Sequence, residues 1–249
     1  LNLLYTFIMK KIKNILYTIL LMLIVYFVYI NLDDITKDLK ALIISKNDLV
    51  IKEPNSYKVD YTFENFNYKI SYVPYNKEEL IDIYFNVLNN GYNEFTFYCP
   101  KEYKSCTKDV ESIGNDSKLM SNINNYVHPY NSFEVIKASY DSYGKITLNI
   151  IKAYTEKEIN LIEDKVNEII NNYINSSMND EEKIKIIHDY IINNAHYDTS
   201  LEKLKYSKAD DVLLYKRGIC SSYTDAMSIF LNKFNINNYK ISSEDHIWN

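Results

Sequence analysis

An uncharged apolar run at residues 15–32 limits where this chain can fold. Thr18 and Asn31 are its only clearly polar members. As a helix, the run would be roughly 27 Å long, close to the thickness of the hydrocarbon core of a bilayer. Soluble domains rarely bury a helix of this length without a charge. The run therefore predicts a membrane span rather than a core helix.

The flanks of the run predict its orientation. Three lysines between positions 10 and 13 precede it, and Asp33 and Asp34 follow it. By the positive-inside rule, residues 1–32 form a cytoplasmic N-terminus and an anchor, and the remainder lies outside the cytoplasm. No small-x-small cleavage site precedes the aspartates, so a single-pass anchor in the cell membrane is favoured over a cleaved signal peptide.

Composition and charge argue against nucleic acid as a partner. The chain has 249 residues with 28 basic and 33 acidic side chains, and its net charge is −5 at pH 7. Its lysines are scattered among carboxylates, so no basic surface for a polyanion is expected. The length and the 47% apolar content suffice for a membrane segment and about two modest domains.

The residues after the anchor predict a stalk and then an α+β accessory domain. Residues 33–55 mix short apolar clusters with charges, which is typical of a stalk with little packing. Residues 56–154 combine strand-like stretches with a helical spacing of apolar residues. Tyr57–Phe63 and Tyr68–Val73 are rich in aromatic and β-branched residues and could pair as a hairpin, whereas Asn76 begins a helical stripe. This mixture predicts an α+β fold.

Turn and capping signals divide the following part of the chain. The turn-prone residues 141–144 separate two strand-like stretches and predict a second hairpin. Thr155 opens a capping box and an amphipathic helix, residues 155–178, that is expected to bridge two domains. Asn179 begins another capping box, and with it a last domain at residues 179–249.

Cys99 and Cys106 are separated by six residues, which fits neither a C-x-x-C redox motif nor a zinc site. Outside the cytoplasm the pair can form a disulfide, and two unrelated thiols are the equally weighted alternative. No residues stand at metal-ligand spacing, so neither a metal nor a cofactor is expected.

The segment around Cys220 is the best candidate for chemistry. Gly218 is expected to permit a tight turn, and apolar residues recur at helical spacing from Tyr223 onward, so Cys220 falls in the first turn of a helix. There the helix dipole and the unpaired N–H groups favour a thiolate nucleophile. Cys220 shares a stripe with Tyr223, so its sulfur should face another element. Judged from physics alone, inert apolar filler is an equally weighted reading.

Histidines supply the candidate bases. Strand alternation places His246 and Trp248 on one face, and the His246 imidazole is expected about 3 to 4 Å from the Cys220 sulfur. His188 lies on an apolar helical stripe and is interpreted as a hydrogen-bonded core residue. His128 and His196 have no chemical partner in the sequence and remain unassigned.

A glycine before a helix-opening cysteine, followed 26 positions later by His-x-Trp-Asn, resembles the bacterial transglutaminase-like superfamily, whose fold is papain-like. The resemblance covers about residues 179–249. It implies that Cys220 attacks a carboxamide of a peptide or protein substrate, that His246 acts as base and acid, and that a thioester leads to acyl transfer or hydrolysis. The residues expected to support the site or bind substrate are Gly218, Tyr223, Trp248 and Asn249.

The resemblance is incomplete at one point. In the family, an orienting Asp lies on a strand beyond this segment, whereas the chain ends at Asn249. Asp245 should point away from His246, because neighbours on a strand face opposite sides. The domain is therefore expected to be truncated and to have little turnover as it stands. A non-catalytic surface or envelope-associated binding module and an inactive fragment remain the alternatives.

Overall fold

The computed structural model describes residues 2–32, 35–36, 39, 49–60, 66–67, 70–203 and 207–249. The chain divides into two compact units, one of residues 1–49 with 141–144 and the other of residues 50–140 with 145–249. The predicted mixed α+β fold is confirmed. The domain boundaries predicted from the sequence stay predictions.

Helix α1 (Asn2–Ile30) dominates the first unit. Within it, Met9–Ile30 spans 22 residues with a mean hydropathy of 1.9 and no buried side chain, so it is long and apolar enough to cross a membrane. A signal sequence can have the same properties. Its polar side chains bond to the helix itself, as the Thr18 hydroxyl does by donating to the Asn14 carbonyl (2.9 Å). Such bonds lower the cost of placing polar groups among apolar ones.

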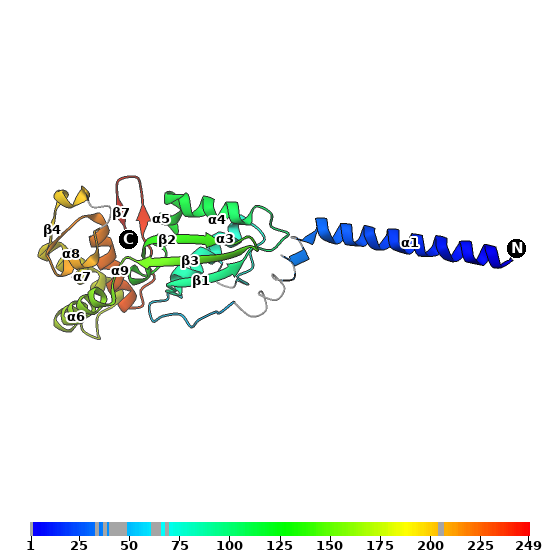
Figure 1. Ribbon diagram of the computed structural model, residues 1–249. Coiled ribbons are helices and arrows are strands. Elements are labelled where there is room, and N and C mark those ends of the chain that lie inside the picture. Colours follow the sequence, from blue (N-terminus) through cyan, green and yellow to red (C-terminus); the bar gives the residue numbers. More distant parts are fainter. Residues whose placement is uncertain are drawn as a thin grey trace. The chain divides into compact units, whose positions relative to one another are not determined.

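A three-stranded antiparallel sheet organises the first part of the second unit. Its strands β1 (Glu94–Tyr98), β3 (Lys145–Lys152) and β2 (Phe133–Tyr140) lie side by side in that order (Figure 1). β2 and β3 form the hairpin that the turn at residues 141–144 predicts. Alternate residues of β3, among them Leu148, are buried, so one face of the sheet contacts the core.

Three helices complete this part: α3 (Lys77–Asn89), α4 (Cys106–Asn115) and α5 (Ser117–Asn125). α3 begins where the sequence predicts, because the Asn76 side chain accepts a hydrogen bond from the Glu79 N–H (2.9 Å). The Tyr84 hydroxyl of α3 donates to the Val110 carbonyl of α4 (3.4 Å), and both residues are buried.

The hairpin predicted at Tyr57–Phe63 and Tyr68–Val73 is absent from the described residues of those stretches, 57–60 and 70–73, which contain no strand. The remaining positions lie outside the described residues. At Val59 the Asn89 side chain accepts from the N–H (2.9 Å) and donates to the carbonyl (2.8 Å). A side-chain amide thus replaces the neighbouring strand that the pattern predicts.

The predicted stalk at residues 33–55 lies largely outside the described residues. Residues 51–55 are exposed, and two hydrogen bonds join this last part to the rest of the second unit. The Asn55 N–H donates to the Asn90 carbonyl (3.0 Å), and the Tyr92 hydroxyl donates to the Lys52 carbonyl. Residues 52–55 therefore belong to the folded unit.

The second part of the unit is mainly helical. It contains α6 (Glu156–Tyr173), α7 (Asp180–Asn194), α8 (Ala209–Leu213) and α9 (Cys220–Lys233), with a short 3₁₀ helix at Thr199–Lys203. Another 3₁₀ helix, Pro129–Asn131, precedes β2 in the first part. Capping boxes at Thr155 and Asn179 start α6 and α7 as predicted. One buried core joins all four helices to Tyr130 and Tyr154, which come from the first part.

Two short strand pairs connect these helices. β4 (His196–Tyr197) pairs in parallel with β5 (Arg217–Gly218), immediately before α9. β6 (Ile241–Ser242) and β7 (Ile247–Trp248) form an antiparallel hairpin after it. Of the two residues that the sequence predicts on one strand face, Trp248 lies in β7 and His246 directly before it.

His128 lies inside the unit, and His196 is exposed on β4. The His128 Nδ1 accepts from the Tyr130 N–H (3.1 Å), and its ring stacks on Tyr57 with the centroids 5.2 Å apart. Burial lowers the pKa of His128 to about 3, so the ring is neutral at physiological pH. These contacts give His128 a structural role.

Cys99 and Cys106 lie at disulfide distance, with the sulfurs 1.93 Å and the Cα atoms 5.8 Å apart. The bond would join the end of β1 to the start of α4. We expect Cys99→Ser to lower the free energy of unfolding by about 2 to 3 kcal/mol under oxidising conditions, because the short loop no longer restricts the unfolded chain. Urea unfolding with and without reductant measures this. Mass spectrometry of unreduced peptides is the control, and two free thiols would contradict the pairing.

Candidate active site

A serine one turn into α9 fixes the start of that helix. The Ile219 N–H donates to Ser222 Oγ (2.9 Å), and the Ser222 hydroxyl donates to the Ile219 carbonyl (2.8 Å). Ile219 is the extended N-cap residue, and Cys220 is the first residue of the helix, as predicted. Its thiol is free and partly exposed. The positive end of the helix dipole therefore lies beside a solvent-accessible sulfur.

Gly218 is required by close packing rather than by a tight turn, which corrects the sequence prediction. The residue lies in β5, and its φ is not in the left-handed region. A Cβ at this position would lie 2.1 Å from Ser222 Oγ and 2.6 Å from Val212 Cγ2. Because α8 and α9 approach the strand so closely, no larger residue fits without moving the start of α9.

The β6–β7 hairpin places His246 beside α9. The Thr224 hydroxyl of α9 donates to the Ile247 carbonyl (3.0 Å), and the Asn249 side chain donates to Ser228 Oγ (2.7 Å). The His246 and Trp248 rings stack with their centroids 5.8 Å apart, so the prediction that they share a face is confirmed. Two hydrogen bonds thus hold the last strand against the helix that begins with Cys220.

A buried ion pair fixes the start of the same hairpin. The Lys240 ammonium lies 2.9 Å from Asp225 Oδ1, and the side chains are 2% and 1% exposed. The Tyr154 hydroxyl donates to the second Asp225 oxygen (2.8 Å). α5 holds the other side, because the Lys240 N–H donates to the Asn125 carbonyl (2.9 Å) and the Asn125 side chain donates to Ser242 Oγ (2.8 Å). The hairpin is therefore tied to both parts of the unit.

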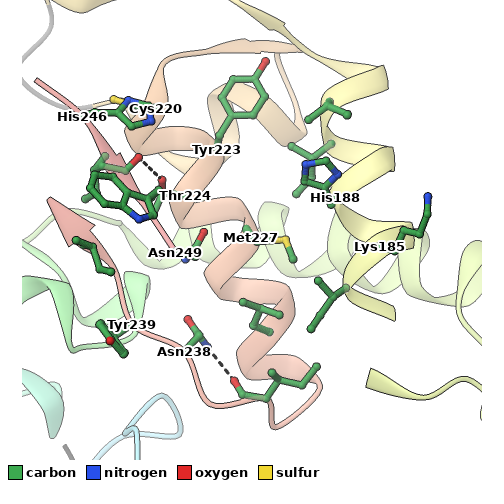
Figure 2. A pocket seen from close by; sticks show the side chains of 18 of the residues that line it. Lys185, His188, Cys220, Tyr223, Thr224, Met227, Asn238, Tyr239, His246 and Asn249 are labelled. Atoms are coloured by element: carbon green, nitrogen blue, oxygen red, sulfur yellow. Dashed lines mark hydrogen bonds between the residues drawn. The ribbon is translucent and has the colours of Figure 1, made fainter. Parts of the chain in front are cut away.

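A cavity of about 1060 Å³, here named the apolar groove, lies between α7, α9 and the hairpin (Figure 2). Its lining is mostly apolar and includes Ile184, Ile192, Tyr223, Met227, Leu231 and Trp248. The Asn237, Asn238 and Asn249 amides also line it. A groove of this kind suits an apolar side chain with a few polar groups that fix its orientation.

A second cavity of about 920 Å³, here named the polar cleft, lies between α5, β2 and the hairpin. Four residues line both cavities: Tyr197, Cys220, His246 and Ile247. The candidate nucleophile and the candidate base therefore lie where the two cavities meet.

Residues 167–237 match the family model of the transglutaminase-like superfamily. The resemblance predicted from the sequence is thereby confirmed for this part of the chain. This transglutaminase-like segment begins within α6 and ends shortly after α9, so it contains Cys220 but stops before His246. No curated protein matches the chain.

The relation of Cys220 to His246 is partly defined. Figure 2 shows both side chains at the same end of the apolar groove, Cys220 from the start of α9 and His246 from the residue before β7. Both residues are among those described, and no hydrogen bond joins them. Direct proton transfer from the sulfur to the imidazole stays a prediction, as do the catalytic assignments. Within the described residues no cluster of His, Cys, Asp or Glu could hold a metal ion.

His188 lines the apolar groove of the transglutaminase-like segment and is not the core residue that its stripe predicts. Its side chain is 60% exposed, and its Nδ1 lies 3.1 Å from Asp189 Oδ1. α7 buries only Ile187 and Ile191, so His188 falls at the edge of a narrower stripe. In the sequence, the adjacent Asp189 could have indicated that His188 is exposed, because an exposed carboxylate is a natural partner for an imidazole.

Tyr197 lines the candidate site, although it is not among the site residues predicted from the sequence. It lines both cavities, and its ring stacks with that of Tyr223 at a centroid distance of 6.2 Å. It reaches the site because β4 pairs with β5 directly before Cys220. A two-residue parallel pairing between distant segments leaves no periodicity to detect.

Proposed function

We propose that this protein is a cysteine enzyme that acts on amides of peptides or proteins, with Cys220 as nucleophile and His246 as base and acid. One observation carries the proposal: Cys220 opens α9 within the transglutaminase-like segment and lies with His246 at the junction of two cavities. A helix start favours the thiolate, and the two cavities can receive the two sides of a substrate.

The reaction proceeds in two halves. The Cys220 sulfur attacks the carbonyl carbon, and the C–N bond breaks as His246 gives the proton of the thiol to the departing amine. The product of this half is a thioester. His246 then takes a proton from water or from a second amine, which attacks the thioester carbon. The C–S bond breaks, and His246 returns the proton to the departing Cys220 sulfur. The product is an acid after hydrolysis and a new amide after transfer.

The neighbours of the reacting pair have supporting roles in this scheme. Trp248 holds the imidazole plane through its stacked ring. Asn249 anchors the strand to α9 through Ser228. Tyr223 forms part of the groove wall one turn beyond the nucleophile, and Gly218 lets α9 start close to β5.

The test is the rate at which iodoacetamide alkylates Cys220 at pH 7. With the disulfide intact, Cys220 is the free thiol that the described residues provide, so the label reports on it alone. We expect alkylation at least about tenfold faster than for free cysteine, because an activated thiol contains more thiolate. The same protein unfolded in urea is the matched control. Equal rates in the folded and unfolded protein would refute the catalytic proposal and favour a non-catalytic binding module.

We also propose that α1 anchors the protein in the cell membrane and that the second unit lies outside the cytoplasm. Lys10, Lys11 and Lys13 at the N-terminal end of Met9–Ile30 and the disulfide-distance cysteines support this orientation. Protease added to intact cells should digest the second unit while a cytoplasmic control protein survives. Digestion only after lysis would show that the second unit lies in the cytoplasm. Full-length protein in the soluble fraction would show that α1 is not an anchor. Protein that lacks α1 would show that α1 is a cleaved signal sequence.

A further inference from the structure

The polar cleft lies beside a β-strand. Four consecutive residues of β2, 133–136, line it. Side chains of a strand alternate between its two faces, so a cavity over one face would be lined by every second residue. In β2 this alternation is interrupted by a register irregularity between Phe133 and Val135, within the stretch that lines the cleft. The cleft therefore lies beside the first, irregular half of β2.

The position of β2 in the sheet supports this description. The order β1-β3-β2 places it at the border of the sheet, and within the described residues its one strand partner is β3. None of its eight residues is buried, whereas β3 buries three. α4 contacts the same strand, and the Tyr140 hydroxyl donates to Glu111 of α4, so the part of β2 that faces the cleft is residues 133–136. A border strand without a second strand partner can act as a template for an added strand.

The exposed charges of the polar cleft have one sign. Glu134, Glu244 and Asp245 line it and are exposed. Among the described lining residues, the one cationic side chain is Lys240, which is 2% exposed and paired with Asp225. Substrates with positive charge are therefore favoured over those with negative charge.

We propose that the polar cleft binds an extended, positively charged peptide segment as an added strand along the edge of β2, and that this segment leads the reacting amide to Cys220. The inference rests on the proposed function. Residues 133–136 can pair with about four peptide residues, a length of roughly 13 Å. Cys220 and His246 also line the cleft, so a segment bound there can reach the sulfur. Its backbone pairs with β2, and its cationic side chains face the three carboxylates.

The test uses hexapeptides that carry one chloroacetamide and have either lysine or glutamate at the other charged positions. Alkylation of Cys220 by each peptide is measured against chloroacetamide alone, using the full chain in detergent. We expect the lysine peptide to react about tenfold faster than the glutamate peptide at low salt, from three modest charge interactions. The difference should shrink at high ionic strength. Equal rates for the two peptides would overturn the inference.

Matched variants locate the effect. Glu134→Gln, Glu244→Gln and Asp245→Asn together should reduce the ratio of the two peptide rates to about one. The control carries the same charge change outside both cavities, at the exposed residues Glu53→Gln, Glu94→Gln and Asp164→Asn, and should retain the tenfold ratio. If both triple variants lose the ratio, the preference reflects net charge and the cleft assignment is wrong.

N-methylation of the lysine peptide tests strand addition. An added strand uses the N–H groups of alternate residues, so methylation should slow alkylation at every second position and have little effect between them. Uniform or absent sensitivity would overturn the β2 edge as the binding element. These rate ratios test peptide binding and not the proposed catalytic role. Slow alkylation by chloroacetamide alone would refute an activated thiol. Fast alkylation by chloroacetamide without a preference between the peptides would refute only the proposed peptide binding in the polar cleft.

Discussion

Replacement of Cys220 by alanine is expected to abolish thioester formation and to lower turnover of a peptide amide at least about a thousandfold, because the nucleophile is removed. His246→Gln should lower turnover by about 10² to 10⁴, since it removes the base and acid but leaves an amide near the sulfur. The measurements are amine release and detection of the acyl-enzyme by mass spectrometry, on an amide that the wild-type protein turns over.

Two further variants make this result specific. Trp248→Phe keeps a ring beside His246 and should have a much smaller effect than Trp248→Ala, which removes the stack. Circular dichroism should show that each variant is folded. Wild-type turnover by Cys220→Ala would exclude the covalent mechanism. Wild-type turnover by His246→Gln would require another base, for which His188 is a candidate because it also lines the apolar groove.

The largest stability effect is expected at the buried ion pair. Lys240→Met leaves the Asp225 carboxylate buried with only its hydrogen-bonded neighbours, so we expect the free energy of unfolding to fall by about 3 to 5 kcal/mol. Adding Asp225→Asn removes the uncompensated charge and keeps an oxygen for the Tyr154 hydroxyl. The double variant should therefore regain part of the loss. Urea unfolding provides the free energies.

An exposed pair supplies the control. Lys185 and Asp189 lie 2.5 Å apart on α7, with side chains 74% and 42% exposed. Lys185→Ala should cost less than about 1 kcal/mol, because water screens an exposed pair. If Lys240→Met cost no more than Lys185→Ala, the buried pair would not hold the hairpin in place.

The parts of the fold that could be predicted depend on neighbours in sequence. The starts of α3, α6 and α7 follow from side chains that cap their own helix within three residues, as Asn76 does with Glu79. The β2–β3 hairpin follows from its turn. The placement of Cys220 in the first turn of α9 could also be predicted from nearby residues, namely Gly218 and the helical spacing of apolar residues after Tyr223.

The parts that could not be predicted depend on partners far away in sequence. Val59 lies outside any strand because Asn89, thirty positions later, bonds to its backbone. His188 is exposed because the width of the buried stripe on α7 is set by α8 and α9. Tyr197 reaches the site through pairing with a segment twenty residues away. The polar cleft needs α5, β2 and the hairpin together, and no local pattern contains all three.

The attachment of the hairpin to α5 affects how this architecture can vary. Asn125 contacts Lys240 and Ser242 across more than one hundred positions of sequence, and Tyr154 reaches Asp225 across 71 positions. Recombination at the start of the transglutaminase-like segment would separate the hairpin from the surface that supports it. Exchange between related genes should therefore preserve residues 117–249 as one inherited block, and a chimera that replaces α5 alone would need compensating changes in the hairpin.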